Sequence, residues 1–289
     1  MTGEPISEAA LREQHTEYER PRVAELEAAL DQIARDRNPV SVEIPTGDNT
    51  IRFGVGGDTQ LGSLYECAEE FRAYCRLLID MGIRTLLHPG DVLDGHGIYR
   101  GQEFELHKVG LSAQLAWFKE VTADLDIDVY FVTGNHDGSF ASKVGFDIGS
   151  AIEAQNARWH CLGRDTGRVT LRAANGRSYE VMLLHPGGGT AYALSYRPQK
   201  TVEQLEGGHK PQMLCMGHYH KSEFIPTYRN VAVIQSGCFQ WQTPFMVRGS
   251  IAAHVGGWII DATPGAEADL CNTVSARFVA FYAAEVAPC

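Results

Sequence analysis

The sequence predicts an α/β protein with two packed, mixed β-sheets and helices on their outer sides. From residue 51 apolar strands alternate with amphipathic helices, and a βαβαβ order of this kind builds a largely parallel sheet. The second half changes character: after a helix near 198–206, residues 222–284 are expected to form short strands and turns. The expected elements of the first half are strands at 51–57, 84–90 and 128–134 and helices at 65–81 and 103–125.

A separate helical segment is expected to precede this domain. Residues 6–36 have helical periodicity interrupted near Pro21, and their apolar positions share one face: Val23, Leu26, Leu30 and Ile33. Such a stripe must be covered, so we expect it to dock on the main domain or to pair with a second copy as a homo-oligomer. The expected division is therefore an N-terminal helical extension, 1–40, and a main domain, 41–289.

Composition and charge limit the classes of function. The hydrophobic fraction of 44% is ordinary for a globular protein, and no apolar run approaches the roughly 20 residues that a membrane span needs. The N-terminal stretch is polar and acidic, unlike a secretory signal, and the seven scattered cysteines favour free thiols over disulfides. We therefore expect a cytoplasmic protein. Its formal net charge of -11 opposes non-specific binding of duplex nucleic acid.

Five expected strands end in glycine or proline followed by side chains that can bind metal. Ligands of open α/β sheets bind beyond the carboxyl ends of the strands, so these side chains should meet in one place. A single Gly-Asp pair after a strand is usually a turn, but five such clusters in order are hard to explain by turns alone. They are GGDTQ (Asp58, Gln60), HPGDVLD (Asp91, Asp94), TGNHD (Asn135, His136, Asp137), LLHPGG (His185) and MGHYH (His218, His220).

The order of these motifs resembles that of the calcineurin-like metallophosphoesterases over residues 50–285. A narrower likeness is to uncharacterised bacteriophage and prophage metallophosphoesterases, through stretches such as GDVLDGHGIYRGQEFE, VTGNHDGSF, GHYHKSEF and CFQWQTPFM. The resemblance implies a four-layer α/β/β/α sandwich of two mixed sheets with outer helices.

The resemblance also implies two divalent metal ions that share Asp91. Mixed nitrogen and oxygen donors suit manganese, iron or zinc, and two such ions would activate a bridging water for in-line attack on phosphorus. Gln60 stands where the family usually has histidine; its harder amide oxygen favours manganese or magnesium, so manganese is expected first. The first ion would take Asp58, Gln60, Asp91 and His220, and the second Asp91, Asn135, His185 and His218.

His136 and Asp94 are the expected catalytic pair. In the family the histidine after the asparagine ligand protonates the leaving oxygen or steadies charge in the transition state. Asp94 matches the aspartate that orients it, although a turn-capping role for Asp94 stays open.

The substrate contacts are less constrained by the motifs. Solvated loop positions or core packing are equally good explanations for several of them, and for Trp241, which could otherwise stack on a base. His88 is expected to be structural. The candidates for substrate binding are His96, Tyr99, Arg100, Gly188, Tyr192 and Arg197.

Three functions remain open on the sequence. The leading one is hydrolysis of a phosphodiester, with single-stranded or short nucleic acid as a substrate and the protein acting as a nuclease. A phosphomonoesterase acting on a nucleotide, a phosphoprotein or a small metabolite is the alternative. A non-catalytic binding subunit is the third, although only Gln60 departs from the ligand pattern.

Overall fold

The computed structural model describes residues 41–141, 147–189, 191–205, 210–265 and 273–282. The helix expected within 6–36, and with it the proposed oligomer contact, lies outside the described residues.

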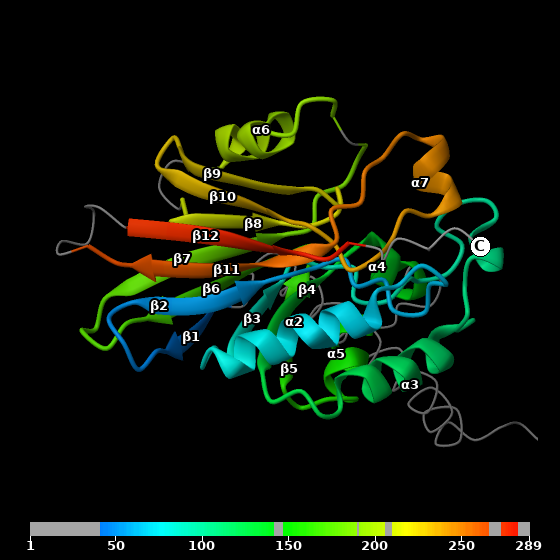
Figure 1. The fold of residues 1–289 in the computed structure, drawn as a ribbon, viewed down its shortest axis with the longest axis horizontal. Coiled ribbons are helices and arrows are strands. Elements are labelled where there is room, and N and C mark those ends of the chain that lie inside the picture. The colour runs from blue at the N-terminus through cyan, green and yellow to red at the C-terminus, as the bar shows by residue number, and fades with distance from the viewer. Residues whose placement is uncertain (1–40, 142–146, 190, 206–209, 266–272, 283–289) are drawn as a thin grey trace, which may run out of the picture. The chain divides into compact units, whose positions relative to one another are not determined.

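One sheet contains the βαβαβ start of the domain, as predicted. Its order is β12-β11-β2-β3-β4-β5, with β2, β3, β4 and β5 parallel and β11 and β12 added in antiparallel fashion beside β2 (Figure 1). The strands are β2 (Ile51–Val55), β3 (Thr85–His88), β4 (Asp128–Thr133), β5 (Trp159–Arg164), β11 (Gly256–Thr263) and β12 (Thr273–Ala280).

The second sheet has the order β1-β6-β7-β8-β10-β9 and is also mixed. Strands β7, β8 and β10 run parallel, whereas β6 and β9 are antiparallel to their neighbours β7 and β10. The strands are β1 (Ser41–Pro45), β6 (Thr166–Arg172), β7 (Ser178–Leu184), β8 (Met213–Met216), β9 (Ser222–Tyr228) and β10 (Val231–Ser236).

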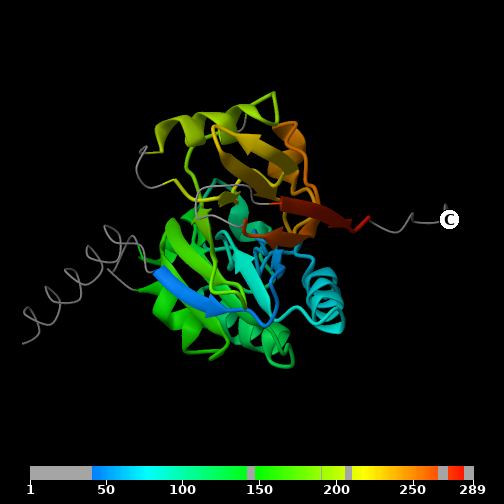
Figure 2. The ribbon, with the colours of Figure 1, turned by 90° about the vertical axis from the view of Figure 1, so that its left-hand side faces the viewer.

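Three apolar layers hold the domain together and confirm the two-sheet sandwich with outer helices. The central layer joins the sheets, with Phe53 and Leu87 facing Val181 and Ile234. Strand residues of opposite parity pack against helices on the outer sides, which explains why β8 and β10 are buried on both faces. The helices α2 (Ala68–Asp80), α3 (Leu111–Thr122) and α5 (Ile148–Glu153) cover the first sheet, and α6 (Tyr196–Gln204) covers the second (Figures 1 and 2).

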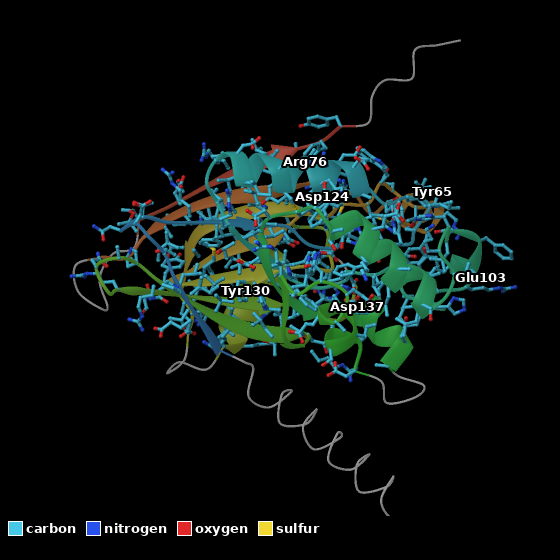
Figure 3. The ribbon with its side chains drawn as sticks, turned by 90° about the horizontal axis from the view of Figure 1, so that it is seen from below. Tyr65, Arg76, Glu103, Asp124, Tyr130 and Asp137 are labelled. Carbon is cyan, nitrogen blue, oxygen red and sulfur yellow. The ribbon has the colours of Figure 1, made fainter. Side chains whose placement is uncertain are left out.

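Ion pairs fasten the two long outer helices to each other. Asp124, which follows α3, accepts hydrogen bonds from Arg72 at 2.8 Å and from Arg76 at 3.3 Å, both on α2. Figure 3 shows Arg76 and Asp124 beside each other at α2.

Two expected elements differ from the prediction. The helix expected at 103–125 is a short 3₁₀ helix η1 (Gln102–Phe104), a loop, and then α3. Gly110 begins α3 with a φ of 84°, a conformation that ends any continuous helix there. The second half also contains strands of six to eight residues and a short helix α7 (Pro244–Arg248), capped by the Thr243 side chain.

Candidate metal centre

The two sheets place their polar loops together at one end of the domain. A predicted ligand follows the last residue of each of five strands by one to three positions. These strands are β2, β3 and β4 of one sheet and β7 and β8 of the other. His185 after β7 lies 3.2 Å from Asp91 after β3, and the His218 backbone nitrogen after β8 lies 2.9 Å from Asp58 after β2. The structure therefore brings motifs from both halves of the chain into one cluster.

The backbone is strained at this cluster. Positive φ angles are uncommon outside glycine and tend to gather at functional sites, where the surrounding packing maintains them. Nine non-glycine residues have them in the described part of the chain, and five are predicted metal ligands: Asp58 (50°), Gln60 (48°), Asp91 (55°), His218 (76°) and His220 (54°). These turns direct side chains from the strand ends toward one point.

Two glycines permit the close approach of the loops. A Cβ on Gly134 would lie 2.2 Å from Asp91 Oδ1, and one on Gly217 would lie 2.3 Å from the Pro89 carbonyl and 2.9 Å from Asp58 Oδ2. No side chain fits at either position unless a ligand residue moves.

Asp91 lies at the centre of the predicted ligands, between Gln60 and His185. Gln60 Nε2 is 3.1 Å and His185 Nε2 3.2 Å from its Oδ2 atom. The His136 backbone N–H donates to Oδ1 at 2.9 Å. Burial opposes the charge of Asp91, but the His185 and His136 imidazoles outweigh it and hold the pKa of the carboxyl well below its usual range. The position suits a ligand shared by two ions.

His185 has one nitrogen fixed and the other directed at oxygen atoms. Its Nδ1–H donates to the Pro89 carbonyl at 2.8 Å, which turns Nε2 toward Asp91 Oδ2 and toward Asn135 Oδ1 at 3.1 Å. Burial lowers the pKa of this imidazole, but Asp91 and Asp58 raise it to about 9. A proton on Nε2 thus holds the three atoms together in the metal-free protein, and a divalent cation could replace it.

The residues fit metal ions, and unpaired atoms support this. Among the described residues four buried side-chain atoms lack a hydrogen-bond partner, although buried polar atoms are rarely left so, and two of the four, Gln60 Oε1 and His220 Nδ1, belong to predicted ligands. Asp91, His185 and His218 offer ligand atoms within 4.8 Å of one another. His220 Nε2 lies 3.5 Å from Asp58 Oδ1. Carboxylate, imidazole and amide donors together suit manganese, iron or zinc.

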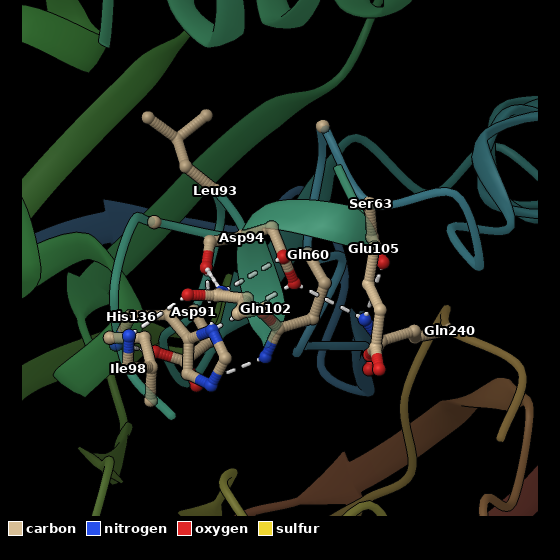
Figure 4. Close-up of polar contacts among 12 residues, drawn as sticks. Gln60, Ser63, Asp91, Leu93, Asp94, Ile98, Gln102, Glu105, His136 and Gln240 are labelled. Atoms are coloured by element: carbon tan, nitrogen blue, oxygen red, sulfur yellow. Dashed lines mark hydrogen bonds and ion pairs between the residues drawn. The ribbon is translucent and has the colours of Figure 1, made fainter. Parts of the chain in front are cut away.

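His136 is oriented by the backbone of Asp94 rather than by its carboxylate, which corrects the expected contact. His136 Nδ1 lies 2.7 Å from the Asp94 carbonyl oxygen but 3.8 Å from the carboxylate. The carboxylate is instead held by two buried amides, Gln102 at 3.0 Å and Gln240 at 3.2 Å (Figure 4). Burial raises the pKa of Asp94 to about 6, so at neutral pH its charge is present beside the imidazole.

Asp137 has a structural role that the sequence analysis did not assign. Its buried carboxylate accepts three backbone N–H groups, from Val92, Leu93 and Gly134, at 2.8 to 3.1 Å. It thereby ties the loop after β3 to the loop after β4, which carry Asp91 and the Asn135–His136 pair. The TGNHD motif contained this signal, because an acid directly after a ligand loop can close that loop onto its neighbour.

A cavity of about 300 Å³ opens beside the cluster, and only some of the expected substrate contacts line it. Tyr99 and Gly188 line it, whereas His96, Arg100 and Tyr192 do not. Arg197 lies just behind its wall and donates to the Gly189 carbonyl at 2.6 Å. Six of the predicted metal or catalytic residues line the same cavity: Gln60, Asp91, Asn135, His136, His218 and His220.

The far wall of the cavity is apolar and was missed by the sequence analysis. It is formed by α7 and the loops around it: Ile98, Tyr99, Thr243, Phe245, Met246 and Ile251. Trp241, for which base stacking and core packing were both open, packs against the core beneath the first sheet. In the CFQWQTPFM stretch that contains it, the residues that line the cavity are Gln240, Thr243, Phe245 and Met246.

The two six-stranded mixed sheets with outer helices form the calcineurin-like phosphoesterase fold, as the resemblance predicted. No model of a known protein family matches the chain. The chain is 26% identical over 249 residues to the DNA polymerase II small subunit of Halobacterium salinarum, a match that covers 73% of this chain and 48% of that protein. It is 25% identical over 271 residues to the subunit of the same name from Methanocaldococcus jannaschii, covering 77% and 44%. The chain thus spans about half the length of these relatives.

Solved structures with a similar fold include Chaetomium thermophilum Vps29, with a TM-score of 0.41 and 11% identity over 80% of this chain and 96% of that one. A predicted phosphoesterase from Streptococcus pneumoniae matches with a TM-score of 0.38 and 10% identity, over 79% and 98%. The narrower likeness to phage proteins stays a prediction. Among the described residues, no helix has the length and apolar character to cross a membrane.

Proposed function

We propose that this protein is a two-metal phosphoesterase that hydrolyses a phosphodiester, with single-stranded or short nucleic acid as its substrate class. The observation that carries the proposal is the crowding of metal-capable side chains around Asp91. His185 Nε2 lies 3.2 Å and Gln60 Nε2 3.1 Å from Asp91 Oδ2, and Asn135 Oδ1 lies 3.1 Å from His185 Nε2. Divalent cations would stabilise such a cluster of buried carboxylate, amide and imidazole groups.

This geometry supports the two ligand sets that the resemblance implies. Asp58, Gln60, Asp91 and His220 would hold one ion, and Asp91, Asn135, His185 and His218 the other. Two divalent ions would supply positive charge to the phosphoryl oxygens and a water acidic enough to attack at neutral pH. Manganese is the expected metal because the Gln60 amide is a hard oxygen donor.

His136 has the position of a leaving-group acid in this proposal. Its Nδ1–H donates to the Asp94 carbonyl and its side chain lines the cavity, so Nε2 is the nitrogen available for proton transfer. The Asp94 carboxylate lies 3.8 Å from Nδ1, and Gln102 and Gln240 hold that carboxylate in place. The side chain can then pass a proton to the departing oxygen without binding metal.

Two observations favour nucleic acid over other phosphate esters. The relatives found by sequence are named as DNA polymerase subunits. The cavity also has one polar and one apolar wall, as a phosphate joined to a base requires. Because the protein is strongly acidic, with a net charge of -11, a short or single-stranded substrate is favoured over long duplex.

Hydrolysis assays with manganese test the proposal. We expect cleavage of bis-p-nitrophenyl phosphate and of end-labelled single-stranded DNA, slower cleavage of p-nitrophenyl phosphate, and no cleavage after chelation. Asp91→Asn should lose bound metal and turnover, whereas Glu120→Gln, an exposed carboxylate on α3, should behave as wild type. Turnover in chelator, or a fully active Asp91→Asn variant, would refute the two-metal assignment.

The same assay separates the alternatives. Faster cleavage of the monoester would favour a phosphomonoesterase, which the acidic surface also suits. A non-catalytic subunit is favoured by the relatives' description as small subunits of a polymerase. It predicts that the metal-loaded protein cleaves none of the three substrates.

A further inference from the structure

We infer that the apolar wall of the cavity, made by Tyr99 and the α7 segment, binds the base of a nucleotide whose phosphate lies at the metal centre. The inference rests on the proposed function and specifies its substrate: a phosphodiester with a nucleobase next to the scissile bond. It assigns Phe245 and Tyr99 as specificity residues.

The aromatic side chains of this wall are accessible and already stacked on each other. Phe245 lines the cavity and is 43% exposed, so its ring is accessible to a ligand. The Tyr99 ring stacks on it with centroids 4.6 Å apart and an interplanar angle of 17°. A planar group entering the cavity thus meets an aromatic surface that already exists, as the stacking of a base requires.

This aromatic surface is held in place by hydrogen bonds and a helix cap. The Tyr99 hydroxyl donates to the buried Glu105 carboxylate at 2.7 Å, which fixes the ring. Helix α7 is fixed by its Thr243 cap and by the buried Met246, whose carbonyl accepts the Ile251 N–H at 2.9 Å. A preorganised surface loses little conformational entropy when the ligand binds.

The charge of the cavity suits a single phosphoryl group. None of the described residues that line it is a lysine or an arginine. Binding of several phosphates would need such cations, so the cavity suits one phosphoryl group at the metal centre and an uncharged planar group opposite. At about 300 Å³ it is at the small end of ligand cavities and matches one nucleotide rather than a longer stretch of chain.

A link between the wall and the catalytic residues supports a shared substrate. Gln240, four residues before α7, donates to Asp94 Oδ1 at 3.2 Å and to Ser63 Oγ at 3.0 Å. Gln240 therefore contacts Asp94, the residue that orients His136, and the chain after Gln240 leads directly into the apolar wall.

The test uses dinucleotides that differ in their bases alone. Wild-type protein with manganese would be assayed on thymidylyl-thymidine and on analogues in which the 5′ or the 3′ base is replaced by hydrogen. Removal of the stacked base should lower kcat/KM about 5- to 150-fold, the range measured when a stacking side chain is removed. Phe245→Ala should lower kcat/KM by a similar factor on the full dinucleotide and much less on the abasic analogue. Phe245→Trp should restore the preference for the dinucleotide that carries both bases.

Val247→Ala is the matched control, because Val247 is on the same helix and 60% exposed but does not line the cavity. Calorimetry gives a readout that does not depend on turnover: thymidine monophosphate should bind Phe245→Ala more weakly than wild type, and deoxyribose 5-phosphate should bind both equally. Two results would overturn the assignment of a base. One is an equal kcat/KM of the wild-type protein for all the dinucleotides. The other is faster cleavage of a dialkyl phosphate than of the dinucleotides, if that cleavage is lost in Phe245→Ala. Absence of any cleavage would instead refute the proposed phosphoesterase itself.

Discussion

Gly134→Ala is predicted to disable the site through a single methyl group. Gly134 has no left-handed φ, so alanine is allowed by its backbone, and the penalty is steric. The added Cβ would lie 2.2 Å from Asp91 Oδ1 and 2.8 Å from the Asp91 backbone nitrogen, where real contacts stay above 3.0 Å. The Asp91 carboxylate must therefore move by about 0.8 Å, and with it the hydrogen bond from His136.

A displacement of this size is large for a catalytic site. Misplacement of a reacting group by 1 Å can cost about 10²-fold in rate, and overpacking typically destabilises a core by about 1–3 kcal/mol. We expect Gly134→Ala to lose about 10²-fold in turnover of bis-p-nitrophenyl phosphate and to bind manganese more weakly. The assay is metal content by mass spectrometry, measured with rate and melting temperature on the same preparation.

Gly138→Ala is the matched control four residues further along α4 (Asn135–Ala141). A Cβ there meets no atom of the described residues within 4 Å, and alanine is the better helix former by about 0.5–1 kcal/mol. This variant should keep its metal and rate and melt at the same or a slightly higher temperature. Full metal content and normal turnover in Gly134→Ala would refute the reasoning, since Asp91 could then move without consequence and would not be the shared ligand.

Three further predictions separate the roles of the remaining groups. His136→Ala leaves every proposed ligand in place, so metal content should stay near wild type while hydrolysis of an alkyl diester falls about 10²–10⁴-fold and that of an aryl diester less; equal losses on both esters would exclude a leaving-group acid. Gln60→His supplies the softer imidazole and should tighten zinc relative to manganese, measured by competition with a chromogenic chelator; an unchanged ratio would place Gln60 outside the metal site. The metal-free protein should lose stability as pH rises from 5.5 to 9. Burial raises the pKa of Asp94 to about 6, and Asp91, acting against burial, raises that of His185 to about 9. Both folded-state values exceed the unfolded ones, so each contribution is complete at low pH and disappears as pH rises through the folded pKa. Melting curves in chelator would show the decline, and manganese should reverse it; a flat profile would contradict it.

The sequence determined the parts of this protein that local signals encode. Apolar runs of four to six residues that end in glycine or proline and a polar side chain predicted β2, β3 and β4 and the positions of Asp58, Asp91 and Asn135 after them. The ends of strands are visible in sequence because the turn chemistry lies beside the strand. The sheet class followed from the order of strands and helices.

Tertiary structure alone decided how these residues are held and what faces them. Asp94 is fixed by Gln102 and by Gln240, which is 146 positions away in the chain, and its carbonyl, not its carboxylate, contacts His136. The apolar wall depends in the same way on α7 folding back over the loop that carries Tyr99. Contacts over such separations have no periodicity or spacing that marks them. They are set by how the two sheets pack, because that packing alone brings the ends of distant strands to one cavity.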